Sequence, residues 1–349
     1  MQKGNPQLKA VGYEKFVTKD FVKMELFESL KQKISGKGLK IVFPEGTDAR
    51  ILGAANRLNA DGLITPVFIG NVKEVTETLI SRGINPEGFE IYDPENCGRF
   101  ETMTETFVER RKGKVTEEQA KELLKDPNYF GTMLVYMKIA DGMVSGAIHS
   151  TADTVRPALQ IIKTKPGVKS VSGAFIMVRG RDDNEKYIFG DCAINIKPDA
   201  PTLADIAVAS AETAALFDID PKVAMLSFST KGSGKSEEVD KVVEATKLVK
   251  EDYPEIEIDG ELQFDAAFVP AVARQKAPDS TVAGRANVFI FPDIQSGNIG
   301  YKIAQRLGNF EAIGPILQGL NAPVSDLSRG SNEEDVYKLA IITAAQALK

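Results

Sequence analysis

The sequence predicts an α/β protein of two domains, each with a mostly parallel β-sheet flanked by helices. Short apolar runs alternate with amphipathic stretches along almost the whole chain, which is the pattern of parallel strands connected by helices. The chain has 349 residues, more than a single hydrophobic core usually organises, so two domains are expected.

The first half contains short apolar runs separated by helical patterns. The expected strands are 39–43, 67–69 and 89–92, and the expected helices are 47–58, 101–112, 117–124, 130–140 and 151–162. Two longer apolar runs, 168–178 and 187–196, flank a polar turn at 179–184. These two runs predict a hairpin at the start of the second domain.

The second half continues the alternation and ends in a helix. The expected strands are 223–228 and 288–291, and the expected helices are 203–217, 237–250, 266–275 and 299–307. Ser331, followed three residues later by Glu334, has the pattern of a capping box. The last helix is therefore predicted to begin there.

Composition and charge exclude several classes of partner. At 43% hydrophobic and 26% charged residues the chain is typical of soluble globular proteins, and no apolar run approaches the roughly 20 residues that span a bilayer. The net charge of −6 argues against nucleic acid. A few well-placed arginines on an acidic protein can still bind a polyphosphorylated small molecule.

Cysteine and histidine are scarce. Cys97 and Cys192 cannot form a disulfide framework and have no metal-ligand spacing, which favours two reduced thiols in a cytosolic protein. His149 is the single histidine, so a mechanism that needs two is excluded. No Gly-x-Ser-x-Gly elbow presents a serine nucleophile, and His149 is therefore expected to have a structural role.

The most informative segment is 323–336, where a polar loop leads into the last helix. It places the hydroxyl of Ser328 beside the guanidinium of Arg329. Asp335 lies four residues before Leu339, so its carboxylate is expected on a half-buried face of the helix. A half-buried carboxylate near a hydroxyl and an arginine is typical of a site that moves a proton beside a phosphate.

A second candidate is the loop Ser229-Thr-Lys-Gly-Ser-Gly-Lys-Ser, which nearly matches a nucleotide-binding P-loop. That pattern requires glycine where this chain has Ser229, and no Walker B acid accompanies it. A turn of this composition between a strand and a helix still exposes backbone N–H groups that favour phosphate. The loop is interpreted as a phosphate cradle at Ser229, Thr230, Gly232 and Ser233, and a plain solvent-facing turn is the alternative.

Five further positions carry weaker signals. Gly297 and Asn298 lie in a similar Gly-x-x-Gly segment, and Arg306 lies on the helix expected after it. Arg111 ends a helix, where a solvated charge is the ordinary explanation. Arg156 follows Ser150 and Thr151 in a mainly apolar helix, where a guanidinium without a role is unfavourable.

Four motifs together resemble the phosphate acetyltransferase (phosphotransacetylase) family. They are Ile41-Val-Phe-Pro-Glu-Gly, Leu226-Ser-Phe-Ser-Thr-Lys-Gly-Ser, Pro292-Asp-Ile-Gln-Ser-Gly-Asn-Ile-Gly-Tyr-Lys and Ser325-Asp-Leu-Ser-Arg-Gly. They occur in the family's order within residues 24–349, and phosphate butyryltransferases share the pattern more loosely. Residues 1–23 are expected to be an extension without a catalytic part.

The resemblance implies a nested domain layout. Residues 24–162 and 320–349 would form domain I, and residues 163–319 would form an inserted domain II, with the active site in the cleft between them. It also implies a cytoplasmic homodimer.

The resemblance further implies reversible transfer of an acetyl group between acetyl phosphate and coenzyme A. Coenzyme A is then a co-substrate, with no permanently bound cofactor and no metal. Asp335 would deprotonate the thiol, Ser328 would hydrogen-bond the thiol or the developing oxyanion, and Arg329 would hold the phosphate. Arg111, Arg156 and Arg306 match further arginines of the family that contact coenzyme A or the active site.

Other functions remain open at this point. A phosphate butyryltransferase or another short-chain phosphate acyltransferase would share the motifs. A non-catalytic protein that binds acyl-CoA or phosphate would not require a carboxylate on the apolar side of the last helix. A nicotinamide oxidoreductase of nested α/β architecture would require clustered metal-binding aspartates, which the sequence does not contain.

Overall fold

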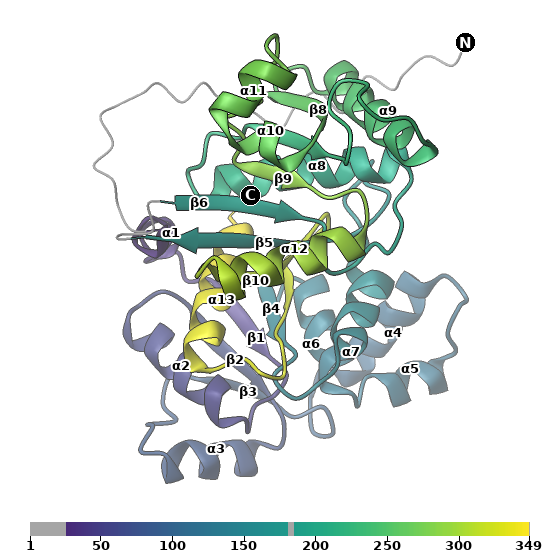
Figure 1. Cartoon of the computed structure of the whole chain (residues 1–349). Helices are drawn as coiled ribbons and strands as arrows, with labels where there is room; N and C mark the ends of the chain where they lie inside the picture. Colours follow the sequence, from purple (N-terminus) through teal and green to yellow (C-terminus); the bar gives the residue numbers. More distant parts are fainter. Residues whose placement is uncertain (1–25, 181–184, 349) are drawn as a thin grey trace.

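The computed structural model describes residues 26–180 and 185–348 and contains two β-sheets (Figure 1). The first has the strand order β11-β4-β1-β2-β3, and all of its pairings are parallel. The second has the order β10-β5-β6-β9-β7-β8; β5 pairs antiparallel with β10 and β6, and the other pairings are parallel. The predicted α/β class with mostly parallel sheets is confirmed.

Strands and helices alternate along most of the chain. The strands are β1 (Lys40–Phe43), β2 (Thr65–Ile69), β3 (Glu90–Tyr92), β4 (Gly142–Ser145), β5 (Ser172–Arg179), β6 (Glu185–Gly190), β7 (Val223–Leu226), β8 (Ile258–Leu262), β9 (Val288–Ile290), β10 (Glu311–Gln318) and β11 (Val324–Asp326). The helices are α1 (Leu26–Ile34), α2 (Ala49–Ala60), α3 (Val72–Ser81), α4 (Phe100–Arg111), α5 (Glu117–Leu123), α6 (Pro127–Tyr136), α7 (Thr151–Pro157), α8 (Ala200–Leu216), α9 (Glu237–Asp252), α10 (Phe264–Phe268), α11 (Pro270–Lys276), α12 (Ile294–Leu307) and α13 (Glu333–Gln346).

The second sheet is built from chain that lies between β4 and β11 of the first. The chain passes between the two sheets twice, and the two passages pair with each other. The N–H of Lys165 donates to the carbonyl of Gly319, and the N–H of Asn321 donates to the carbonyl of Lys163, both at 2.9 Å. This pairing supports the division expected at 162/163 and 319/320, which we retain as a proposal. The expected extension 1–23 lies outside the described residues.

Strand β1 illustrates why the central strands are continuous apolar runs. Ile41 and Phe43 are buried in the cluster that includes α2 and α13, whereas Val42 is buried in a second cluster with α6. A parallel strand covered by helices on both faces has no solvent side, so polar alternation is lost. The same reason explains why the predicted strands 39–43 and 67–69 could be recognised as short apolar runs.

The last helix starts one residue later than the capping pattern suggested. Asn332 is the N-cap of α13: its side chain accepts the N–H of Asp335 at 3.0 Å, and the Asp335 carboxylate accepts the N–H of Asn332 at 2.8 Å. The predicted capping box of Ser331 and Glu334 is therefore wrong. Ser331 still belongs to the preceding turn, where its N–H donates to the carbonyl of Ser328.

Other boundaries differ for local physical reasons. The expected strand 187–196 stops at Gly190 because the carboxylate of Asp191 turns the chain by accepting N–H groups of residues 173, 193, 194 and 195. The expected helix 266–275 is two helices, α10 and α11, and the expected helix 151–162 changes to a π-helix at Ala158, after Pro157. The polar turn expected at 179–184 falls partly outside the described residues.

Helix α12 begins at Ile294, five residues before its predicted start. Gly297 and Asn298 therefore lie within a helix and not in a strand-to-helix turn. A methyl group on Gly297 would overlap the carbonyl oxygen of Asp191, and the Asn298 amide donates to the carbonyl of Cys192 at 3.2 Å. Close packing of α12 on the chain after β6 explains both residues without a phosphate.

We predict that Gly297→Ala lowers the free energy of unfolding by about 1–3 kcal/mol, the usual effect of overpacking a close contact. Urea denaturation should measure this loss, with Gln295→Ala, an exposed position in the first turn of the same helix, as the control of near-wild-type stability. A stable Gly297→Ala protein that binds its substrate poorly would restore the phosphate interpretation.

Candidate active site

The carboxyl ends of β1, β4 and β11 meet at one edge of the first sheet. These three strands are parallel neighbours, with Asp326 of β11 opposite Ser145 of β4 and Ile41 of β1 opposite Gly142. The loops that follow them therefore emerge side by side. Ligands of parallel α/β sheets bind at this edge, which makes these loops the candidate site.

Glu45, in the loop after β1, organises this edge. Its side chain is fully buried and accepts the backbone N–H groups of residues 146, 147, 148 and 149 at 2.8–3.2 Å. It also contacts Nδ1 of His149 at 2.9 Å. Burial alone would raise the pKa of Glu45, but the His149 bond and the backbone donors outweigh it and lower that pKa. Glu45 is therefore a buried anion enclosed by the loop after β4.

Arg50, on α2, connects the loop after β4 to the loop after β11. Its guanidinium donates to the carbonyl of Ala147 at 2.8 Å and to the carbonyls of Arg329 and Ser331 at 3.0 and 2.9 Å. An ion pair with Asp48 at 2.8 Å holds the guanidinium in place. The sequence did not indicate this role, because Arg50 is 279 residues from Arg329 in the chain.

Asp326, the last residue of β11, is a buried acid with one free oxygen. Its Oδ2 accepts the hydroxyl of Thr151 at 2.7 Å, while Oδ1 and the nearby buried Thr154 hydroxyl oxygen have no hydrogen-bond partner among the described residues. Burial raises the pKa of Asp326 to about 6, against the effect of the Thr151 hydroxyl, and the negative charge of Glu45 adds to the rise.

The predicted residues of the loop after β11 are accessible. Ser328 and Arg329 are exposed, and the Arg329 guanidinium forms no hydrogen bond or ion pair with any residue of 26–180 or 185–348. Asp335 is partly buried at the start of α13, and its carboxylate serves the helix cap described above. A free guanidinium, a hydroxyl and a carboxylate thus lie within eight residues of one another at the edge of the sheet.

Arg111 and Arg156 both lie near enough to Tyr129 of α6 for their charges to act on its hydroxyl. Burial raises the pKa of the Tyr129 hydroxyl, and the positive charges of Arg156 and Arg111 oppose that rise. Arg156 is exposed, so the expectation that it sits among apolar side chains is wrong; the apolar residues of α7 face the other way. The pKa of Lys163 is lowered chiefly by Arg110 and also by Arg111, which indicates a locally positive surface.

The Gly-Ser loop after β7 does hold an anion, but that anion belongs to the protein. The carboxylate of buried Glu261 accepts the N–H of Gly232 at 2.7 Å and the hydroxyl of Ser229 at 2.9 Å. The N–H of Thr230 donates to Ser233 Oγ, and that of Gly234 donates to Ser229 Oγ. The expected open cradle is therefore closed in this structure, because internal acceptors occupy the N–H groups from 229 to 234.

Arg306 is exposed in the last turn of α12, in the part of the chain that forms the second sheet. No hydrogen bond or ion pair between described residues joins Arg306 or the loop 229–234 to the loop that contains Ser328 and Arg329. The predicted residues of the first sheet thus form two groups, and those of the second sheet lie on other loops and helices.

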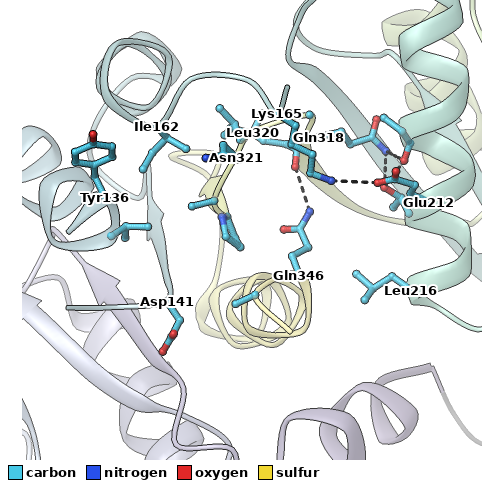
Figure 2. A pocket seen from close by; sticks show the side chains of 18 of the residues that line it. Tyr136, Asp141, Ile162, Lys165, Glu212, Leu216, Gln318, Leu320, Asn321 and Gln346 are labelled. Carbon is cyan, nitrogen blue, oxygen red and sulfur yellow. Dashed lines mark hydrogen bonds and ion pairs between the residues drawn. The ribbon is translucent and has the colours of Figure 1, made fainter. Parts of the chain in front are cut away.

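A cavity of about 440 Å³ lies at the junction of the two sheets, but it does not coincide with this edge (Figure 2). Asp141 and Pro323, which directly precede β4 and β11, line it, as do Lys165, Glu212 and Gln346. The cavity is therefore at the amino ends of the strands, opposite the loops of His149 and Arg329. None of the predicted site residues lines it.

Two kinds of feature are absent from the described residues. Within 26–180 and 185–348 no cluster of three or more His, Cys, Asp or Glu side chains is arranged to hold a metal ion. No helix in the same part of the chain has the length and apolar character needed to cross a membrane.

Comparison with known proteins identifies the class. The family described as Phosphate acetyl/butaryl transferase matches residues 25–344. A Phosphate acetyltransferase of Bacillus subtilis (strain 168) is 62% identical over 324 residues, which cover 93% of this chain and 99% of that protein. A Phosphate acetyltransferase of Staphylococcus aureus (strain Mu50 / ATCC 700699) is 58% identical over 329 residues and is likewise covered to 99%.

The chain is also similar to solved structures of phosphotransacetylases. A phosphotransacetylase from Streptococcus pyogenes superposes with a TM-score of 0.91 at 63% identity, over 93% of this chain and 98% of that one. EutD phosphotransacetylase from Staphylococcus aureus has a TM-score of 0.87 at 58% identity, over 92% and 98%. The chain belongs to the phosphate acetyl/butyryl transferase family, as its four motifs predicted.

We predict that Asp326→Asn stabilises the protein more as the pH rises. The pKa of Asp326 is about 6 in the folded protein against an ordinary 3.8, so its contribution to stability is fully present below pH 3.8 and is lost as the pH rises through 6. An asparagine removes this loss and can still accept the Thr151 hydroxyl. The free energy of unfolding of the variant, relative to wild type, should increase by about 2 kcal/mol between about pH 4.5 and pH 8.

Asp153→Asn is the matched control because the contribution of Asp153 to stability depends on pH with the opposite sign. Hydrogen bonds from Ser150 lower the pKa of Asp153, so its contribution is present above that pKa and is lost on acidification. Relative to wild type, the control should lose stability only as the pH rises toward 3.8, and the difference should stay constant between pH 4.5 and pH 8. If the free energies of unfolding of Asp326→Asn and wild type changed in parallel with pH, the raised pKa of buried Asp326 would be contradicted.

Proposed function

We propose that this protein is a phosphate acetyltransferase, which transfers an acetyl group reversibly between acetyl phosphate and coenzyme A. The observation that carries the proposal is the placement of the free Arg329 guanidinium, the Ser328 hydroxyl and the Asp335 carboxylate on one loop and helix start, at the carboxyl edge of the first sheet. The names of relatives that are 58–63% identical over nearly the whole chain support it.

In the proposed mechanism the coenzyme A thiolate attacks the acetyl carbonyl directly in a ternary complex. Asp335 accepts the thiol proton, Ser328 hydrogen-bonds the thiol or the developing oxyanion, and Arg329 holds the phosphate. An ordinary thiol has a pKa of about 8.5 and an ordinary aspartate about 3.9, so the transfer is opposed by about 6 kcal/mol in water. A cation such as Arg329 near the thiol reduces that difference because it favours the thiolate.

Coenzyme A requires a surface for its phosphate groups, and the positive region around Arg111 and Arg156 fits that requirement. Arg110, Arg111 and Lys163 are close enough for their charges to interact, and the charges of Arg111 and Arg156 both act on Tyr129. Arg306 would contribute from α12 if the two domains approach each other across a cleft. Coenzyme A acts as a co-substrate in this proposal, and no permanently bound cofactor takes part.

A phosphate butyryltransferase or another short-chain phosphate acyltransferase is the second candidate. The matching family is described with both acetyl and butyryl activities, and a branched-chain phosphotransacylase from Enterococcus faecalis V583 shares the fold at 20% identity. We place the proposed enzyme in the cytoplasm, in keeping with two free cysteine thiols. We also propose a homodimer; the exposed side chains of Ile299, Ile303 and Leu307 form an apolar stripe along α12 that supports association.

The proposed function is tested by release of inorganic phosphate from acetyl phosphate with and without coenzyme A. We expect release that depends on coenzyme A, with one acetyl thioester formed for each phosphate released. Propionyl and butyryl phosphate, compared at equal concentration, assign the acyl preference. Binding of both ligands without turnover would instead support a non-catalytic binding protein.

We predict that Asp335→Asn lowers kcat by roughly 10²–10⁴-fold and leaves the melting temperature nearly unchanged. The amide oxygen can still accept the Asn332 N–H, so the helix cap survives, but the proton acceptor is lost. Asn332→Ala is the reciprocal control, because it removes the cap and keeps the carboxylate. It should lower stability by about 0.5–2 kcal/mol and change kcat only a few-fold.

Asp335→Asn and Asn332→Ala, compared by steady-state kinetics and thermal unfolding, separate the role of Asp335 as proton acceptor from its role in the helix cap. If both variants lose stability and neither loses kcat at a temperature where they are folded, Asp335 is a capping residue and the base lies elsewhere.

A further inference from the structure

His149 is the single histidine of the chain, and its Nδ1 is hydrogen-bonded to Glu45 at the carboxyl edge of the first sheet. It lies in the segment 147–151 that follows β4. Both ends of that segment are connected by hydrogen bonds to the end of β11 or to the loop after it. Arg50 joins the carbonyl of Ala147 to that of Arg329, and the Thr151 hydroxyl donates to Asp326 at 2.7 Å. His149 is thus held beside the loop of Ser328 and Arg329.

The two ring nitrogens of His149 have different surroundings. Nδ1 lies 2.9 Å from Oε1 of Glu45, a carboxylate that can only accept, so Nδ1 carries a proton in either charge state of the ring. Nε2 forms no hydrogen bond with any described residue, and the side chain is 22% exposed. Nε2 is therefore the nitrogen that can gain and lose a proton toward a ligand.

The charges that face His149 favour its protonated form. They are carboxylates from three elements: Glu45 after β1, Asp126 at the start of α6 and Asp153 in α7. The bond to Glu45 raises the pKa of His149 above its ordinary 6.5, against the opposing effect of burial. A ring whose surroundings favour the cationic form suits a leaving phosphate, and a buried carboxylate that orients the ring is the arrangement of acid–base histidines in other enzymes.

We propose that His149, oriented by Glu45, is a further catalytic residue that donates its Nε2 proton to the leaving phosphate. This inference rests on the proposed phosphate acyltransferase activity. As the sulfur–carbon bond forms, the bond between the acyl carbon and the bridging oxygen breaks. The thiol proton passes to Asp335, and the Nε2 proton of His149 passes to the bridging oxygen, which leaves as hydrogen phosphate.

The step leaves Asp335 protonated and His149 neutral, and transfer of one proton from Asp335 to His149 through solvent restores the enzyme. In the reverse reaction the neutral Nε2 accepts the proton of hydrogen phosphate, as microscopic reversibility requires. No additional reactant is needed.

The first test is His149→Asn, whose amide nitrogen can take the place of Nδ1 and keep the bond to Glu45 while Nε2 is removed. We expect kcat to fall about 10²-fold or more, with KM values within a few-fold. In the direction of acyl-CoA formation the wild-type kcat should fall as the pH rises through the His149 pKa, and this limb should be absent in the variant. Ile80→Ala, at an isoleucine 60% exposed in α3 and outside the candidate site, is the control and should match wild type.

The second test needs no variant, because one histidine gives one set of ¹⁵N ring resonances. NMR titration of ¹⁵N-histidine-labelled wild type should give a pKa above 6.5, and inorganic phosphate should raise it further. An active wild type whose His149→Asn variant keeps kcat and the pH profile would overturn the inference, and so would a histidine pKa insensitive to phosphate. A wild type without coenzyme A-dependent phosphate release would instead contradict the proposed function itself.

Discussion

The buried carboxylate of Glu45 is the contact on which the carboxyl edge of the first sheet depends. It satisfies four consecutive N–H groups after β4 and the Nδ1 of His149. The buried donors of residues 146 and 147 would otherwise be without partners, at a cost of about 1–3 kcal/mol each. The carboxylate is tolerated in the interior only because the loop supplies all of these bonds, so the loop and the acid stabilise each other.

The same solution occurs twice in the second sheet. Asp191 accepts three N–H groups after β6 and that of Gly173 in β5, and Glu261 occupies the Gly-Ser loop after β7. Internal carboxylates therefore fill the backbone anion sites at the ends of these strands. A phosphate ligand must instead find cations that the protein leaves free, and Arg329 is such a group among the described residues.

The first sheet acquires its functional loops from distant parts of the chain. Strand β11 returns after the whole second sheet and pairs with β4, which brings residue 326 opposite residue 145. Arg50 then bridges the two loops, and α13 packs across the same sheet with its buried face. The chemistry proposed for Asp335, Arg329 and His149 thus depends on a nested topology, because no local segment contains all three.

The sequence by itself determined the α/β class, most helices, the family and the loop of Ser328 and Arg329, because these depend on periodicity and on contiguous motifs. Strands β4 and β11, only four and three residues long, gave no periodic signal, although they carry the site. Tertiary structure alone decided the roles of Glu45, Arg50, His149 and Asp326. Their contacts join residues about 100–280 positions apart, and a buried acid is distinguished from a solvated one only by its neighbours in space.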